Sequence, residues 1–498
     1  MWPPPSDDRD AVSGAPRHVA IVGGGIAGLA TAFALQEQAA RAEFPLSLTV
    51  IEAGVSWGGK IATHRVGELV IERGPDSFLS QKPAGLELCA KLGLSDRIVN
   101  TNPSGKGAFV YSRGKLRELP EGLVLFVPSK LGPFLRSGLL SLPGILRMGA
   151  DLVLPKQHVK GDESLAAFFR RRFGAEAFER LIEPLMAGIY AGDAEQMSLR
   201  ATFPRFIELE RKHGSLIRGM LAGRRKAAFS GQSAHAAGPQ RTMFVTLRNG
   251  MDELVQTLAA RVEKDGAGLQ LGRRVTALRA PSVRSKVWTY DLMLEDGGVV
   301  TADVVVLAVP AYVAAPLLRP HSRPAAEKLE AIPYATTATA SLAYATKDLG
   351  AQVRGFGFVV PRAEQRDLIA ATWTSLKWPH RAPPSQTLIR CYLGGVGREH
   401  SLALDDEALL RRVKEELRAL AGITAEPAYA EVSRWDRGMP QYTIGHPSRL
   451  EALQVALNPY KGLYLTGAAY RGVGIPDCIK DGSDTAVHIV RYLTERRT

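Results

Sequence analysis

A glycine-rich segment near the N-terminus has the residue types and the spacing needed to hold a phosphate. It matches GxGxxG and consists of Gly23, Gly24, Gly25, Ile26, Ala27 and Gly28. The first glycine of such a pattern permits a tight turn, the second lets the backbone approach a pyrophosphate, and the third lets a helix pack closely on a strand. The phosphates then lie at the positive N-terminus of that helix. The pattern predicts a dinucleotide site, and the alternative is a glycine-rich turn without a ligand.

An acidic residue follows at the distance where a ribose would be bound. Glu52, which precedes Ala53, lies 24 residues beyond Gly28 and ends an apolar run. A carboxylate in this position accepts hydrogen bonds from ribose hydroxyls and repels a 2′-phosphate, which disfavours NADP. NAD and FAD share this fingerprint, so at this point both cofactors stay open.

Three elements must position these residues. Residues 18–23 are a short β-branched run typical of a buried parallel strand, 29–36 have helical periodicity, and 46–52 indicate a second strand. Together they predict a βαβ unit. A strand over 463–466 and a helix over 484–492 follow near the C-terminus. We therefore expect a nucleotide-binding domain assembled from distant segments, with a second α+β region inserted between them.

The composition excludes a mostly disordered, fibrous or multi-span membrane protein. The 498 residues correspond to roughly three domains, with 45% hydrophobic and 23% charged residues. The 63 Lys and Arg exceed the 50 Asp and Glu by 13 charges, which suits an acidic partner. Basic runs interleaved with aromatic residues and zinc-finger spacing are absent, so we expect no nucleic acid partner. Three separated cysteines without a CxxC pair and an N-terminus without an apolar signal region indicate a cytoplasmic protein.

Residues 123–155 are the most apolar stretch of the chain. Prolines and charged residues interrupt them, so they are not expected to cross a membrane. They could lie on a membrane surface, line an apolar substrate cleft or form a buried helical subdomain, and the sequence leaves these alternatives open. Arg170, Arg171 and Arg172 are expected at a solvent-exposed helix end, the alternative being a surface for anions or a partner.

Two further segments resemble the FAD-binding segments of the flavin amine oxidase superfamily. They are Gly58-Gly59-Lys60, which follows Glu52, and the LYLTGA sequence at 463–468. The resemblance implies FAD rather than NAD, with the first segment near the second phosphate and the second near the ribitol and the flavin. Some amine oxidases attach FAD through a cysteine upstream of the TG turn, but residues 439–466 contain none. We therefore expect non-covalent FAD.

The predicted fold class is α/β, or α+β overall, with a discontinuous Rossmann-like FAD-binding domain, an inserted substrate-binding α+β region and a helical subdomain. The FAD-binding domain comprises 18–82, 241–312 and 450–498, the mainly helical subdomain 83–220, and the substrate-binding domain 221–240 and 313–449. Residues 1–17, rich in proline and charge, are expected to be a disordered leader.

Five longer motifs make the resemblance more specific. They are IERGPDSF at 71–78, EPLMAGIYAGD at 183–193, ATWTSLKWPH at 371–380, MPQYTIGH at 439–446 and GVGIPDCI at 472–479. They resemble the protoporphyrinogen and coproporphyrinogen oxidase family over residues 18–494, and most closely its bacterial coproporphyrinogen III oxidases. The resemblance implies a six-electron oxidation of coproporphyrinogen III to coproporphyrin III by oxygen, with release of hydrogen peroxide, in haem biosynthesis. Hydride would pass to the flavin N5, so no side chain is assigned as a catalytic base and no metal is expected.

The resemblance also implies contacts for the two ligands. The expected substrate contacts are Lys82, which could pair with a propionate, Gly188, whose carbonyl could meet pyrrole N–H groups, and the apolar walls Ile189 and Phe358. The expected FAD contacts, besides those of the first motif, are Glu52, Ala53, Gly58, Gly59, Lys60, Val275, Trp435, Gly467, Gly474, Ile475 and Pro476. Each could instead have a purely structural role.

Three other functions stay open at this stage. A protoporphyrinogen IX oxidase would share the chemistry, and the apolar stretch 123–155 would suit its more lipophilic substrate. A flavin amine oxidase would share the fold, as would a flavin-free binding protein, although the glycine motifs argue against the last of these. The sequence does not reveal the oligomeric state.

Overall fold

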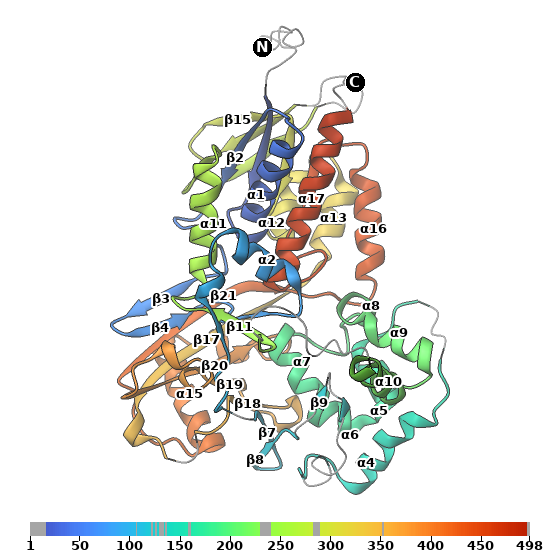
Figure 1. Cartoon of the computed structure of the whole chain (residues 1–498), viewed down its shortest axis with the longest axis vertical. Coiled ribbons are helices and arrows are strands. Elements are labelled where there is room, and N and C mark those ends of the chain that lie inside the picture. Colours follow the sequence, from blue (N-terminus) through green and yellow to red (C-terminus); the bar gives the residue numbers. More distant parts are fainter. Residues whose placement is uncertain are drawn as a thin grey trace.

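The computed structural model describes residues 16–105, 107–120, 123–124, 127–128, 134, 137–157, 161–229, 241–281, 289–350 and 353–495. The predicted leader therefore lies outside the described residues except for its last two, and so do residues 230–240. The described chain forms three regions: a sheet with helices at the end that carries both termini, a second sheet covered by a helix, and a group of shorter helices beside it (Figure 1).

The first sheet is parallel and gathers strands from four parts of the chain. Its order is β12-β2-β1-β16-β22. The bounds are Arg17–Val22 for β1, Leu46–Ile51 for β2, Gly268–Gln270 for β12, Val304–Leu307 for β16 and Leu463–Leu465 for β22. Helix α1, Ile26–Arg41, connects β1 to β2, which confirms the predicted βαβ unit. Every residue of β16 is buried, as expected for a strand of a parallel sheet with a neighbour on each side.

Helix α17, Ile475–Glu495, runs beside α1 (Figure 1). It begins nine residues earlier than the helix predicted over 484–492. Pro476 is tolerated there because it lies in the first turn of the helix, where no backbone N–H partner is lost. Gly482 packs directly on α1, since a Cβ at that position would lie 2.7 Å from the carbonyl oxygen of Ala27. Because proline and glycine are unusual inside helices, the sequence pattern did not predict the first half of this helix.

Other elements surround this sheet. The helices are α2 (Pro83–Lys91), α11 (Asp252–Lys264), α12 (Ala311–Leu318), α13 (Arg323–Glu330) and α16 (His446–Leu457). The smaller strands are β3 (Thr63–Val66), β4 (Leu69–Glu72), β5 (Phe78–Leu79), β6 (Ile98–Asn100), β11 (Phe244–Leu247), β13 (Val275–Arg279), β14 (Tyr290–Leu294) and β15 (Val299–Ala302).

The second sheet has seven strands in the order β21-β17-β20-β19-β18-β7-β8. Their bounds are β7 Phe109–Ser112, β8 Lys115–Glu118, β17 Tyr334–Ala345, β18 Gly357–Val359, β19 Leu368–Trp373, β20 Gln386–Gly394 and β21 Tyr429–Pro440. All neighbouring pairs are antiparallel except β7 with β18. Strands β7 and β8 come from the span predicted as the helical subdomain but extend this sheet.

The two faces of the second sheet pack against different partners. Phe358 belongs to an apolar cluster with Leu417 of α15, Asp406–Ala421. Val359, the next residue on β18, packs against an apolar cluster of the helical region that includes Met186. Because successive side chains of a strand point to opposite faces, α15 and the helical region cover opposite sides of the sheet.

The helical region consists of short elements around an aromatic core. They are α4 (Leu142–Gly149), α5 (Leu165–Phe173), α6 (Ala175–Ala177), α7 (Glu183–Tyr190), α8 (Leu199–Thr202), α9 (Pro204–His213) and α10 (Leu216–Phe229), with the short strands β9 (Leu123–Val124) and β10 (Val127–Pro128) nearby. The ring of Phe169 meets the rings of Phe168 and Phe206 edge-on at 5.3 and 5.1 Å. Such aromatic pairs add to the area that each ring buries.

The described apolar side chains of the stretch 123–155 are divided between core and surface, and Phe134, Leu139, Leu140 and Met148 are buried in the helical region. Leu142 and Leu146 on α4 are 73% and 76% exposed, and Val153 is 79% exposed. Residues 125–126, 129–133 and 135–136 lie outside the described part of the chain. Among the described helices, none combines the length and the apolar character needed to cross a bilayer.

The three consecutive arginines do not form a solvent-exposed helix end, and that prediction is wrong for two of them. Arg172 is fully buried, and Arg171 pairs with the buried Glu210 at 2.6 Å. Arg170 pairs at 2.5 Å with Glu195, whose side chain is half exposed. A run of charges does not reveal its partners when these come from distant parts of the chain.

Arg172 joins four segments of the helical region. Its guanidinium pairs with the fully buried Asp151 and donates to the carbonyl oxygens of Asp151 and Gly214 at 2.9 and 2.8 Å. The second carboxylate oxygen of Asp151 accepts from Ser215 Oγ at 2.6 Å. With these partners both buried charges are compensated, which a charge away from water requires.

We expect Arg172→Ala to lower the free energy of unfolding by about 3–5 kcal/mol, because it leaves the Asp151 carboxylate buried without its counter-ion. Arg170→Ala is the matched control on the same helix. Its partner is exposed, so we expect a loss of about 1 kcal/mol. Urea titrations of both variants followed by circular dichroism measure the difference. Equal losses would contradict a structural role for the buried pair.

Candidate active site

The predicted phosphate turn lies between β1 and α1, and its glycines have different roles. Gly23 has φ of +112°, and a Cβ on it would lie 2.5 Å from the carbonyl oxygen of Ala308. A Cβ on Gly28 would lie 2.0 Å from the carbonyl oxygen of Gly23. Gly25, the N-cap of α1, has φ of −74°, and no atom lies within 4 Å of a Cβ built there. Packing therefore requires Gly23 and Gly28, whereas Gly25 borders open space at the helix N-terminus.

The segment Gly58–Gly59 forms a second side of this space. The Gly58 amide donates to the carbonyl oxygen of Gly24 at 2.9 Å, which fastens the two turns together. A Cβ on Gly59 would find its nearest neighbour, the Cα of Gly25, at 3.6 Å. We call the open space between these two glycine turns the glycine cradle. Backbone atoms line this space, and the N-terminus of α1 borders it. Backbone N–H groups at a helix N-terminus bind the negative charge of a pyrophosphate.

Glu52 closes the cradle at the end of β2. Its carboxylate accepts hydrogen bonds from the amides of Gly24 and Gly54, both at 2.7 Å. Ala53, between Glu52 and Gly54, is exposed. The acidic group thus lies against the phosphate turn, where the sequence placed a ribose contact.

Lys60 extends away from the two glycine turns. Its ammonium group donates to the carbonyl oxygen of Gly438 and lies 5.9 Å from the centre of the Tyr334 ring. Burial lowers the pKa of Lys60, with a weaker opposing effect of Cys478. The side chain therefore links the cradle to the end of β21, and a contact of Lys60 with phosphate stays a prediction.

The C-terminal segment returns to the first turn of α1. Gly467 has φ of +116°, and a Cβ on it would lie 3.6 Å from the Cβ of Ala27. The buried carboxylate of Asp481 on α17 accepts from Thr466 Oγ1 at 2.8 Å and from the Gly467 amide at 3.1 Å, and it pairs with Arg471 at 2.8 Å. Asp481 thus fixes the turn after β22, a role that the sequence analysis missed.

A stacked pair of rings holds the loop that follows this turn. The Tyr442 hydroxyl donates to the carbonyl oxygen of Ala468 and accepts from the Gly472 amide, both at 2.7 Å. The ring of His446 stacks on Tyr442 at 4.2 Å, and its Nε2 lies 3.1 Å from the carbonyl oxygen of Tyr470. Burial lowers the pKa of His446 to about 4, so the ring is neutral near pH 7. The motif MPQYTIGH had drawn attention to this segment, but not to its structural role.

Three of the expected substrate contacts lie near the start of α17 and the end of α7. The Lys82 ammonium lies 2.6 Å from an oxygen of Asp477, in the first turn of α17. Gly188 and Ile189 on α7 are exposed. The carbonyl oxygen of Tyr190 accepts from Gln441 Nε2 at 3.0 Å. The next residue, Tyr442, binds the Gly472 amide just before α17, so the end of α7 lies against the segment that leads into α17. The structure thus brings Lys82, Gly188 and Ile189 to the junction of the three regions.

Phe358, the fourth expected substrate contact, does not lie with Lys82, Gly188 and Ile189. A Cβ on Gly188 would lie 3.9 Å from Val359 Cγ1, so α7 faces the side of the sheet that carries Val359. Phe358 lies on the opposite face and is 2% exposed. Its contact with the substrate therefore has no support in this geometry.

The remaining expected FAD contacts lie on separate elements. Val275 on β13 is buried in the apolar cluster that includes Leu294, and Trp435 on β21 donates from its indole to the carbonyl oxygen of Arg73 at 2.8 Å. Gly474, Ile475 and Pro476 form the start of α17, where the last two are buried. Within the described residues, no three His, Cys, Asp or Glu side chains are placed to hold a metal ion.

Comparisons with known proteins agree with a flavin site. The family model for flavin-containing amine oxidoreductases matches residues 26–490. The chain is 39% identical to the coproporphyrinogen III oxidase of Bacillus subtilis over 96% of this chain and 98% of that protein. It is 32% identical to the chloroplastic protoporphyrinogen oxidase of rice over 95% and 88% of the two chains. A crystal structure from Exiguobacterium, provisionally named a protoporphyrinogen oxidase, superposes with a TM-score of 0.82 at 33% identity and covers 96% of this chain.

We expect Gly25→Val to give a folded protein that lacks flavin, because its Cβ meets no protein atom within 4 Å while the side chain would occupy the open space of the cradle. Gly149→Val is the control, since Gly149 is exposed and also has no atom within 4 Å of a built Cβ. The ratio of absorbance near 450 nm to that at 280 nm measures flavin content, and the melting temperature measures folding. Full flavin content in the Gly25→Val protein would contradict the assignment of the cradle.

Proposed function

Because the chain belongs to the flavin-containing amine oxidoreductases, we propose that it oxidises coproporphyrinogen III to coproporphyrin III in haem biosynthesis. The observation that carries this proposal is the near full-length similarity to a coproporphyrinogen III oxidase. The net charge of +13 supports it, since the substrate carries four propionates. Three molecules of oxygen would take up the six electrons and six protons and leave as hydrogen peroxide.

FAD is the proposed cofactor, and it is held without a covalent bond. The open space at Gly25 and Gly59 and the carboxylate of Glu52 fit the pyrophosphate and ribose of a dinucleotide. Residues 439–466 contain no cysteine that could attach it. When bound, the flavin supplies the acceptor for hydride that protein side chains lack. The Gly467 turn, fixed by Asp481, would hold the part of FAD beyond the phosphates.

The protein's own residues would hold and orient the macrocycle. Lys82 is an ammonium group at the junction of the three regions, and its present partner Asp477 is a carboxylate that a propionate could replace. Gly188 on α7 would offer its backbone, and Ile189, half exposed, would offer apolar surface. By holding the macrocycle in one orientation, these contacts would place its reacting carbon correctly for the reaction.

Oxygen uptake with coproporphyrinogen III and with protoporphyrinogen IX, measured side by side on the holoenzyme, tests the substrate. We expect porphyrin fluorescence and oxygen uptake with coproporphyrinogen III, at a clearly higher kcat/KM, and release of free flavin after heat denaturation. Preference for protoporphyrinogen IX would favour the activity named for the rice relative. Turnover of neither compound would overturn the proposal.

We place the protein in the cytoplasm, which its three buried free cysteines support because reducing compartments keep thiols unpaired. A peripheral contact of the exposed Leu142, Leu146 and Val153 with a membrane stays a prediction.

We expect Lys82→Gln to raise KM for coproporphyrinogen III about tenfold while kcat stays within about twofold, since it removes one charge-assisted contact made equally before and during reaction. Lys91→Gln is the matched control, because Lys91 is equally exposed and also pairs with a carboxylate at 2.6 Å, that of Glu37. Steady-state kinetics of both variants give the comparison. An unchanged KM in Lys82→Gln would remove Lys82 from the substrate site.

A further inference from the structure

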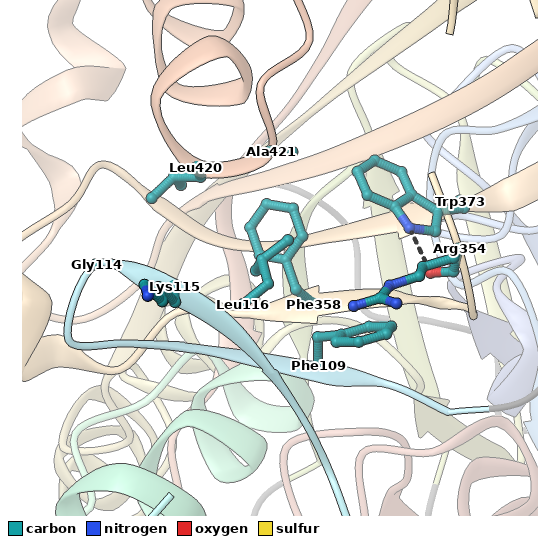
Figure 2. A pocket seen from close by; sticks show the side chains of 9 residues that line it. All are labelled: Phe109, Gly114, Lys115, Leu116, Arg354, Phe358, Trp373, Leu420 and Ala421. Carbon is teal, nitrogen blue, oxygen red and sulfur yellow. Dashed lines mark hydrogen bonds between the residues drawn. The ribbon is translucent and has the colours of Figure 1, made fainter. Parts of the chain in front are cut away.

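We propose that a cavity on the α15 face of the seven-stranded sheet binds an aromatic carboxylate, at a site separate from the candidate active site. The cavity has a volume of about 490 Å³ and lies between the β7–β8 hairpin, β18, β19 and the end of α15. This volume is in the range of pockets that bind small organic molecules. Its apolar walls are Phe109, Leu116, Phe358, Trp373, Leu420 and Ala421 (Figure 2).

The sheet itself separates this cavity from the candidate active site. Phe109 and Phe358 point into the cavity, whereas their neighbours Val110 and Val359 pack against the helical region on the other face. Gly188 on α7 faces Val359. A molecule in the cavity would therefore touch none of Lys82, Gly188 or Ile189.

The walls favour an aromatic body. Phe358 and Trp373 meet edge-on with ring centres 5.7 Å apart, and the ring of Phe109 lies across the cavity from them (Figure 2). The indole N–H of Trp373 donates to the carbonyl oxygen of Arg354 at 3.0 Å, so it is already satisfied. Phe109, Phe358 and Trp373 are 5%, 2% and 1% exposed, so they form the inner wall of the cavity, and an entering ring would pack against the small part of each ring that is exposed.

Two cations at the cavity favour an anionic group on that body. The guanidinium of Arg354 lies 5.1 Å from the centre of the Phe109 ring, and Lys115 comes from the β7–β8 hairpin. Both residues are exposed, and no acidic residue lines the cavity. Within the described residues neither cation forms an ion pair. Contact with the Phe109 ring orients the guanidinium without neutralising it, so a carboxylate would supply the missing charge.

Calorimetric titration of the holoenzyme with 2-naphthoate tests this site. We expect saturable binding, at least tenfold weaker binding of the uncharged 2-naphthamide, and no competition with coproporphyrinogen III. The double variant Lys115→Glu/Arg354→Glu should bind 2-naphthoate at least tenfold more weakly, with unchanged flavin content and oxidation rate. Both side chains are exposed, so the substitutions leave the core intact.

The control variant Lys328→Glu/Lys347→Glu changes the net charge equally at exposed positions that do not line the cavity, and its affinity should stay within about twofold. Ala421→Phe, which fills the cavity, should also abolish binding. Absence of binding to the parent protein, equal affinity in the two double variants, equal affinity for the amide, or competition with the substrate would each overturn the proposal.

Discussion

Backbone atoms at the junction of β1, α1 and α17 approach one another more closely than any side chain allows. A Cβ on Gly23 would overlap the carbonyl oxygen of Ala308, one on Gly28 the oxygen of Gly23, and one on Gly482 the oxygen of Ala27. Glycine at these positions lets the first strand, its helix and the last helix meet at one point. Gly25, between Gly23 and Gly28, borders open space instead, and the other segments of the candidate active site meet at this point.

The other regions are held by different means. The helical region depends on aromatic packing and on the buried pair of Arg172 with Asp151, while the seven-stranded sheet depends on apolar side chains that alternate between its two faces. This alternation gives one sheet two independent surfaces, with α7 on one side and the aromatic cavity on the other. Residues adjacent in the chain, such as Phe358 and Val359, therefore belong to different sites.

The sequence predicts the structure best where the functional residues are close together in the chain and determine the local backbone conformation. The GxGxxG turn, the acidic end of β2 and the parallel strands follow from glycine chemistry and hydrophobic pattern, and the longer motifs indicated the family. The burial of Arg172 was not predicted because its partners, Asp151 and Gly214, come from other segments of the chain. Phe358 was assigned to the substrate because an apolar residue in a strand does not reveal which face it occupies. Asp481 and Tyr442 were missed because their hydrogen bonds join segments that only the folded chain brings together.

The order of strands in the first sheet also has a consequence for folding during synthesis on the ribosome. β1 leaves the ribosome about 280 residues before its neighbour β16, and β22 and α17 are made later still. Contacts of such long range form slowly, and the hydrogen bond of Asp481 with the Gly467 turn can form only after residue 481 has been synthesised. A nascent chain therefore has the glycine cradle long before it has the Gly467 turn that completes the nucleotide site. Loss of α17 would leave part of the apolar surface of α1 uncovered, an exposed surface of the kind that promotes aggregation.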